Sequence, residues 1–213
     1  MEYPYPTIAL AEIKALLSCT LLAQRKNISC WVFEPSHYLE AHFVSFVASD
    51  AFLILRAVDA GVPVRYVPLL WGAFHVVKSS LSIPAGVLSD RIPRKWVVAA
   101  GWCVYAACYA AFSVVRGAAA TVAVFLLYGL YAAACEGAER AMVADFVPAD
   151  RRGTAFGWFH LVTGICALPA SVLFGLLWSV YGAPQAFGVS AGLALLAAAL
   201  LLLLRPAKYE TIR

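Results

Sequence analysis

Charge is what this sequence of 213 residues has least of: only 13% of its residues are Asp, Glu, Lys or Arg. An average soluble domain carries about 25%, so this chain lacks the charge that would cover a water-facing surface. Gly (14) and Pro (11) are too few for a collagen-like or low-complexity chain, and Cys (6) is too rare for a disulfide scaffold. With 63% hydrophobic residues and a mean hydropathy of +0.80, the chain is predicted to be an integral membrane protein.

Metal-binding and redox motifs are also missing. No Cys-x-x-Cys pair occurs, and Cys103, Cys108, Cys135 and Cys166 fall within apolar stretches. We therefore expect no metal site and no cofactor, and interpret these cysteines as small buried hydrophobic residues. The net charge of +4 does not indicate a nucleic-acid partner, because the basic residues lie at the ends of apolar stretches rather than in one patch.

Long uncharged stretches predict the fold class. A membrane crossing needs about 20 apolar residues, and residues 153–204 contain no Asp, Glu, Lys or Arg over 52 positions. Only helices satisfy their own backbone groups in lipid. We therefore predict an all-α, polytopic membrane helix bundle with six transmembrane helices, at about residues 43–60, 64–88, 96–115, 119–145, 154–181 and 184–204.

The chain divides into three parts on this basis. Residues 43–204 form the predicted six-helix bundle, and residues 205–213 form a cytoplasmic tail. Residues 1–42 are a separate N-terminal segment, in which apolar residues recur at helical spacing over residues 7–24. That pattern fits a helix lying at the membrane interface, and a disordered segment is the alternative.

Basic residues predict the orientation in the membrane. One side has eight Lys or Arg residues and the other two, namely Arg91, Arg94, Lys95, Arg151, Arg152, Arg205, Lys208 and Arg213 against Arg65 and Arg116. Because cytoplasmic loops carry the excess of basic residues, we expect the loops at 89–95 and 146–153 and the C-terminus to be cytoplasmic. The expected location is the inner (plasma) membrane, with multiple crossings.

The most specific string lies between the second and third predicted helices. Residues 86–95 read Gly-Val-Leu-Ser-Asp-Arg-Ile-Pro-Arg-Lys. This string resembles the cytoplasmic-loop motif of the major facilitator superfamily, Gly-x-Leu-Ser/Ala-Asp-Arg-x-Gly-Arg-Arg/Lys, with a proline where the family has its second glycine. The matching positions are Gly86, Leu88, Ser89, Asp90, Arg91, Arg94 and Lys95.

The motif residues have physical roles that can be stated in advance. Gly86 is expected to let two helix ends approach closely, and Asp90 to accept hydrogen bonds from the N-terminus of a neighbouring helix. Arg91, Arg94 and Lys95 are expected to hold the loop at the headgroup level.

Two further strings, at 49–57 and 136–155, resemble the seventh and tenth helices of bacterial facilitator transporters. The resemblance covers about residues 43–204 and implies half of a major facilitator fold, the C-terminal six-helix half. It implies secondary active transport of an unknown small solute, with or without a proton, by alternating access. A half of this kind needs the missing transporter half or a second copy. The alternative is an inactive membrane module that binds or regulates another protein.

Ionisable residues inside the membrane are candidates for function, because lipid penalises them. Asp50 lies well inside the first predicted helix, and His75 and Lys78 share a face of the second. We predict that these three residues line a cavity for the solute or the coupling ion.

A second group of charges, Glu136, Glu139 and Arg140, lies toward the cytoplasmic end of the fourth predicted helix, with Glu136 and Arg140 as an i,i+4 pair. Together with Asp90 they are expected to form an ionic lock between helix ends. This lock either has a purely structural role or opens and closes as a cytoplasmic gate.

An enzyme is not expected, and no catalytic residue is predicted. Residues 188–192 read Gly-Val-Ser-Ala-Gly, which matches the Gly-x-Ser-x-Gly pattern of hydrolases. That pattern requires a turn from a strand into a helix, whereas this string lies inside an apolar helix. The same residues are Gly-x-x-x-Gly, a spacing that permits close helix packing.

Overall fold

The computed structural model describes residues 50–145 and 147–203, which form an all-α bundle without a strand in that part of the chain. The fold class predicted from the sequence is thus confirmed as all-helical. The elements are α3 (Asp50–Asp59), η1 (Val64–Tyr66), α4 (Val67–Arg91), α5 (Arg94–Val114), α6 (Ala118–Asp145), η2 (Ala149–Arg151), α7 (Arg152–Tyr181) and α8 (Ala183–Leu203). The predicted segment 1–42, the start of the first predicted helix and the tail 205–213 lie outside the described residues.

The expected loop at 89–95 is much shorter than predicted. α4 continues through Asp90 to Arg91, and only Ile92 and Pro93 separate it from α5. Most of the motif string is therefore helical. The chain turns at Pro93, whose ring restricts the residue before it to extended conformations and suits the position just before a helix.

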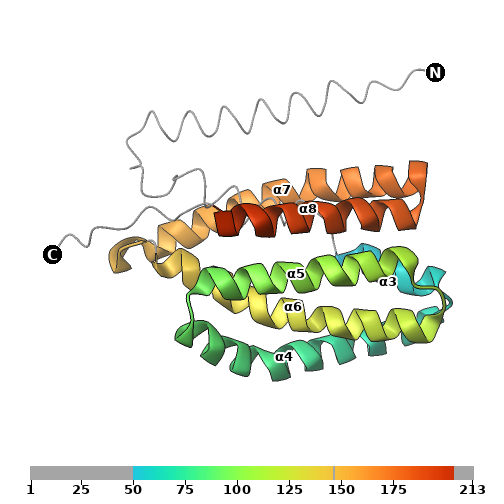
Figure 1. Cartoon of the computed structure of the whole chain (residues 1–213), viewed down its shortest axis with the longest axis horizontal. Helices are drawn as coiled ribbons and strands as arrows, with labels where there is room; N and C mark the ends of the chain where they lie inside the picture. Colours follow the sequence, from blue (N-terminus) through green and yellow to red (C-terminus); the bar gives the residue numbers. More distant parts are fainter. Residues whose placement is uncertain (1–49, 146, 204–213) are drawn as a thin grey trace, which may run out of the picture.

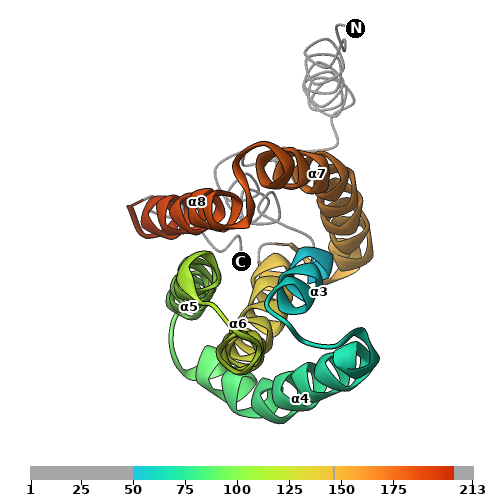
Figure 2. The same cartoon turned by 90° about the vertical axis from the view of Figure 1, so that its right-hand side faces the viewer.

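The helices lie side by side along one direction (Figure 1). In the end-on view α6 is surrounded by α3, α4 and α5, while α8 packs against α5 and α7 (Figure 2). The interior between α3, α4, α5, α6 and α8 is filled with aromatic rings, among them the fully buried Tyr109, Phe112, Phe125 and Phe187. This aromatic core fixes how α3 and α4 lie against α6, and those three helices carry the candidate site.

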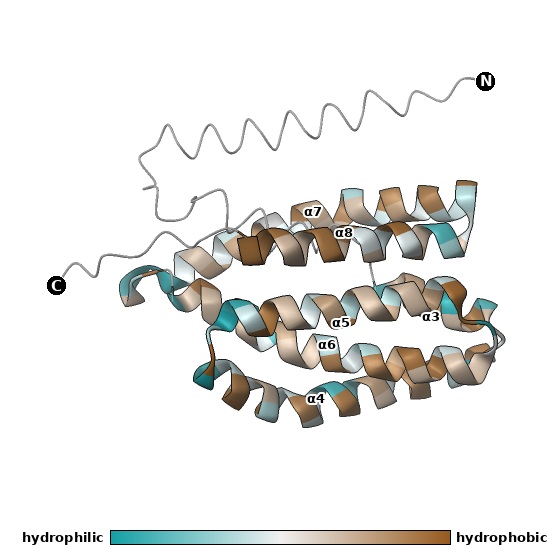
Figure 3. Cartoon of the chain, viewed as in Figure 1, coloured by the Kyte–Doolittle hydropathy of each residue, from teal (hydrophilic) through white to brown (hydrophobic). Residues whose placement is uncertain are grey.

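Four of the described helices are long and apolar enough to cross a membrane: α5, α6, α7 together with the turn before it, and α8. Large apolar side chains point outward along α7, namely Leu161, Ile165, Leu168, Val172, Leu176 and Val180. Hydrophilic residues concentrate near the helix ends (Figure 3). A continuous apolar exterior of this kind fits lipid, and six crossings remain a prediction.

Arg56 ties α3 to the end of α5. Its guanidinium donates from Nε to the carbonyl oxygen of Phe112 at 3.1 Å and from a terminal nitrogen to that of Val115 at 2.8 Å. The last carbonyls of a helix have no partner within the helix and carry its negative dipole end. Arg56, on the neighbouring helix α3, therefore supplies both hydrogen-bond donors for these carbonyl groups and a positive charge at the negative end of the helix dipole.

α5 and α6 lie close together at Gly101. A Cβ atom at this position would collide with Sγ of Cys135 on α6, and Cys135 itself donates to the carbonyl oxygen of Val98 at 3.7 Å. Glycine is required here by space rather than by backbone conformation.

We expect Gly101→Ala to destabilise the protein by about 1–3 kcal/mol, the usual cost of overpacking a filled core. The double variant Gly101→Ala/Cys135→Ala should recover most of this loss, because it removes the sulfur that the new methyl group meets. Unfolding in a mild detergent, followed by tryptophan fluorescence as SDS is added, measures both. A double variant no more stable than Gly101→Ala would show that the sulfur contact is not the cause.

Candidate functional site

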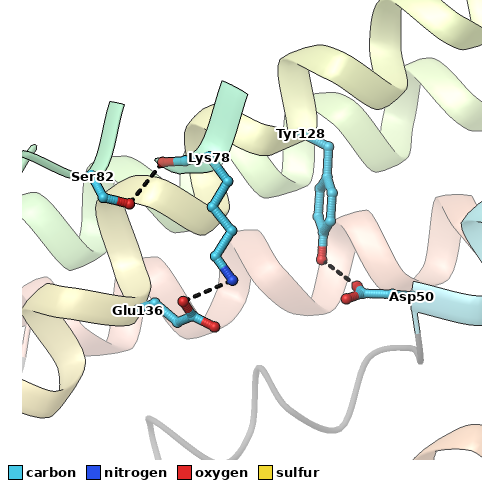
Figure 4. A network of polar contacts seen from close by, with 5 residues as sticks. All are labelled: Asp50, Lys78, Ser82, Tyr128 and Glu136. Atoms are coloured by element: carbon cyan, nitrogen blue, oxygen red, sulfur yellow. Dashed lines mark hydrogen bonds and ion pairs between the residues drawn. The ribbon is translucent and has the colours of Figure 1, made fainter. Parts of the chain in front are cut away.

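Asp50, at the described start of α3, makes a contact that crosses to α6. The hydroxyl of Tyr128 donates to Oδ1 of Asp50 at 2.9 Å (Figure 4). Tyr128 is itself buried among aromatic rings, with Phe74 stacked at 5.8 Å between ring centroids. A buried phenol that donates to a carboxylate holds that carboxylate in one place.

Lys78 and Glu136 form an ion pair between α4 and α6. Nζ of Lys78 lies 2.8 Å from Oε2 of Glu136, and the side chains are 21% and 51% exposed (Figure 4). One turn further along α4, Ser82 donates to the carbonyl oxygen of Lys78 at 2.7 Å. Lys78 and Ser82 on α4 and Glu136 on α6 thus make a polar patch within two largely apolar helices.

His75 lies one turn from Lys78 on α4, as its spacing predicted. Its ring meets Trp71 and Phe74 edge-on, each at 5.2 Å between centroids. Asp50 interacts electrostatically with His75, Lys78 and Glu136. The structure thus brings the three predicted residues Asp50, His75 and Lys78 into one neighbourhood, and adds Glu136 and Tyr128 to it.

Glu139 belongs to a different contact from Glu136, although both are on α6. The indole Nε1 of Trp102 on α5 donates to Oε1 of Glu139 at 3.2 Å. Three residues along a helix change the direction of a side chain by about 60°. As a result Glu136 reaches α4, whereas Glu139 reaches α5.

The motif residues meet at the ends of α4 and α6. Nε of Arg94 lies 3.1 Å from Oδ2 of Asp145, and a terminal nitrogen of Arg94 lies 3.6 Å from Oδ1 of Asp90. Nζ of Lys95 stands 5.6 Å from the ring centre of Trp96. Arg94 therefore links the C-terminal ends of two helices to the first turn of α5.

Three geometric expectations need correction. Asp90, Glu136, Glu139 and Arg140 do not form one ionic lock, because each of the three carboxylates has a different partner. Glu136 pairs with Lys78, and no Glu136–Arg140 ion pair occurs within residues 50–145 and 147–203. Gly86 is not a point of close approach, since no described side chain or neighbouring backbone lies within 4 Å of a Cβ built there.

The contacts of Asp90 and Arg91 also differ in kind from what the motif suggested. Asp90 forms an ion pair with the Arg94 side chain at 3.6 Å, and no hydrogen bond from the N-terminus of a neighbouring helix to Asp90 is found among the described residues. Arg91 ends α4 with an exposed side chain. Basic residues exposed at a helix end fit the expected position at the headgroup level.

Ser190, the serine of the hydrolase-like string, lies inside α8 (Ala183–Leu203) and is buried at 3% exposure. A nucleophile elbow places its serine on a strand-to-helix turn, and no strand occurs in the described part of the chain. The string is therefore a packing segment of α8.

The site also contains residues that the sequence did not single out. Tyr128, Trp102 and Asp145 each make one of its polar contacts. Tyrosine and tryptophan count as apolar in a hydropathy profile, so their polar atoms leave no trace there. The i,i+4 spacing of Tyr105 and Tyr109 on α5 is a sequence signal of an aromatic face on this helix.

The chain is similar in sequence to known proteins. A sequence profile described as Major Facilitator Superfamily matches residues 41–213. Over 138 residues the chain is 35% identical to an uncharacterized MFS-type transporter of Methanocaldococcus jannaschii. The aligned residues cover 62% of this chain and 35% of that relative. The chain thus spans about a third of the length of the curated relative that it matches.

Proposed function

The chain belongs to the major facilitator superfamily, and from this we propose that it acts in secondary active transport of a small solute across a membrane. It is a multi-pass membrane protein, and the transporter relative supports the same general activity. The observation that carries the proposal is the polar cluster of Asp50, Tyr128, Lys78 and Glu136 in the middle of an otherwise apolar bundle.

The position of this cluster supports a place on the solute path. Lys78 and Glu136 are partly exposed in the described structure, and charged groups of membrane helices face a water-filled cavity or a protein partner rather than lipid. We infer that the face formed by α3, α4 and α6 lines the path, with Asp50, His75, Lys78 and Glu136 in contact with the solute or its coupling ion.

The ends of α4 and α6 support a gate. Arg94 links Asp90 and Asp145 through two ion pairs, and such exposed pairs are weak enough to break and reform. We propose that the loop residues Gly86, Asp90, Arg91, Arg94 and Lys95, with Glu139 and Arg140 on α6, move as the site alternates between the two sides. The basic residues support a cytoplasmic position for this end and for the C-terminus, in the inner (plasma) membrane.

Alternating access requires two halves that rock around a central site. The proposed arrangement is that these six helices correspond to the C-terminal half and work against a second six-helix half, from another chain or from a second copy of this one. The alternative proposal is an inactive module that binds another membrane protein. It predicts that the reconstituted protein moves no solute.

The test uses the full chain reconstituted in liposomes and incubated with a small-molecule extract of cells, whose imported compounds are identified by mass spectrometry. We expect at least one solute to accumulate severalfold over protein-free liposomes. The variant Lys78→Met should lose this uptake, and Asp150→Asn, which changes an exposed carboxylate near Arg151, should keep it. Native protein that is inserted and well dispersed yet moves none of the extract's solutes, also as a dimer, would favour the inactive module.

A further inference from the structure

The two carboxylates of the polar cluster differ in the charge of their partner (Figure 4). Glu136 pairs with the Lys78 ammonium at 2.8 Å, so these two charges cancel. Asp50 accepts from the Tyr128 hydroxyl at 2.9 Å, and no ion pair to Asp50 occurs in the described part of the chain. A hydroxyl donor holds a carboxylate in place without neutralising it. One negative charge is therefore left over in the cluster.

The helices around Asp50 do not supply a cation that balances it. The charged or titratable groups of α4 and α6 that act on it are His75, Lys78 and Glu136. Lys78 is already paired with Glu136, and an imidazole is positive only when it is protonated. α5 adds no charge here, because none of its residues after Lys95 is Asp, Glu, Lys or Arg. A bound group that balances Asp50 is therefore cationic.

A row of aromatic rings ends at this carboxylate. The ring of Trp71 stacks on that of Phe74 with 5.4 Å between centroids, and Phe74 stacks on Tyr128 at 5.8 Å. Tyr128 in turn donates to Asp50. Trp71 is only partly buried and the neighbouring His75 is exposed, which leaves ring surface open at the other end of the row. Aromatic faces attract organic cations, and the face of tryptophan does so most strongly.

We propose that the solute of this site is an organic ammonium ion with an apolar body. Its ammonium group binds Asp50 beside the Tyr128 hydroxyl, and its body lies along the open ring surface at Trp71. A solute with a carboxylate instead would compete with Glu136 for the Lys78 ammonium. Binding is non-covalent, and no bond of the solute changes. This inference rests on the proposed function and deepens it, because it names the chemical class of solute that the same site takes.

Model probes test the class without knowledge of the natural solute. The full chain is reconstituted in lipid nanodiscs at about pH 8, where a free imidazole is neutral, and binding of radiolabelled phenethylammonium is measured by scintillation proximity. Unlabelled phenethyl alcohol and phenylacetate are competitors of similar size that are neutral and negative. We expect both to compete roughly tenfold more weakly than phenethylammonium, the effect of one hydrogen bond to a charged group. Methylammonium, which lacks the apolar body, should also be roughly tenfold weaker.

Three substitutions assign the preference to Asp50. Asp50→Asn should remove the preference for phenethylammonium over its alcohol, whereas Asp50→Glu should keep it. Asp59→Asn is the matched control, because it removes an exposed carboxylate at the end of the same helix, and it should bind the probes like the native protein.

Lys78→Met tests the same charge balance by a gain of binding. It frees the charge of Glu136, and we expect phenethylammonium to bind about two- to fivefold more tightly, the effect of a partly exposed ion pair. A solute that is held more tightly leaves more slowly, so this gain agrees with the loss of uptake expected for the same variant. The result also keeps the inference falsifiable if Asp50→Asn does not fold.

Several outcomes would overturn the inference. These are no saturable binding of phenethylammonium to the native protein, equal or better competition by phenylacetate, a preference that survives Asp50→Asn, an equal loss in Asp59→Asn, or no gain in Lys78→Met. The binding assay does not depend on uptake. Ammonium binding by a protein that moves no solute would refute transport alone, and uptake restricted to solutes without an ammonium group would refute the solute class alone.

Discussion

Replacing Lys78 with methionine is expected to lower the stability of the bundle by about 2 kcal/mol, between the small cost of losing an exposed ion pair and the larger cost of breaking a buried one. Methionine keeps the apolar stem of the side chain and removes only the charge. Glu136 is then left without the ammonium that lies 2.8 Å away in the native structure. Because the Glu136 side chain is half exposed, solvent compensates part of the loss.

The control for this result is the neutral pair Lys78→Met/Glu136→Gln, which should recover most of the stability. SDS-induced unfolding of the purified protein, followed by tryptophan fluorescence, gives the coupling free energy from the two single variants and the double variant. Strictly additive effects would contradict the assignment, because they would mean that the two residues do not interact. Glu139→Gln should not rescue Lys78→Met, since Glu139 contacts Trp102 instead.

Arg56→Ala is the second substitution with a large expected effect. Hydrogen bonds to a charged group contribute about 1.5–3 kcal/mol each, and Arg56 donates two, to the carbonyl oxygens of Phe112 and Val115. The loss also removes a cation that contacts the C-terminal end of α5 directly. We expect a combined loss of about 3 kcal/mol, because partial exposure of the guanidinium lets water replace some of the contact.

Arg56→Lys should fall between the native protein and Arg56→Ala, since lysine lacks the planar fork that reaches two carbonyls at once. Arg116→Ala removes an exposed arginine near the same end of α5 and should change the stability by less than about 0.5 kcal/mol. The same unfolding measurement decides between these expectations. Equal losses for Arg56→Ala and Arg116→Ala would contradict the role of the two Arg56 hydrogen bonds.

The helices were predictable because lipid imposes a length on them. The expected ranges 96–115, 119–145 and 184–204 match α5, α6 and α8 to within two residues at each end. The end of α4 was placed three residues too early, at 88 instead of Arg91. Serine and aspartate after an apolar run predict a loop, yet backbone hydrogen bonds extend the helix until Pro93 interrupts it.

The site was only half predictable, for a different reason. Ionisable residues stand out in an apolar sequence, so Asp50, His75 and Lys78 are candidates from their position alone. Their partners depend on how far each helix is rotated about its axis, and that rotation comes from packing around the aromatic core. The grouping of Glu136 with Glu139 was wrong for this reason, since a rotation of about 60° between them sends them to different neighbours.

The junction between α7 and α8 has a consequence for how the chain enters its membrane. One residue, Gly182, joins the two helices with φ of +87°, and residues 153–204 carry no Asp, Glu, Lys or Arg. Moving a charged side chain into the bilayer costs about 2.5–3.5 kcal/mol on insertion scales, and this hairpin moves none. Both helices are therefore able to enter the bilayer together as a hairpin, with the turn at Gly182 crossing first. Arg151 and Arg152 remain on the side from which the hairpin enters, and so set its orientation. The α7–α8 hairpin thus needs none of the polar contacts of α3, α4 and α6 in order to be inserted.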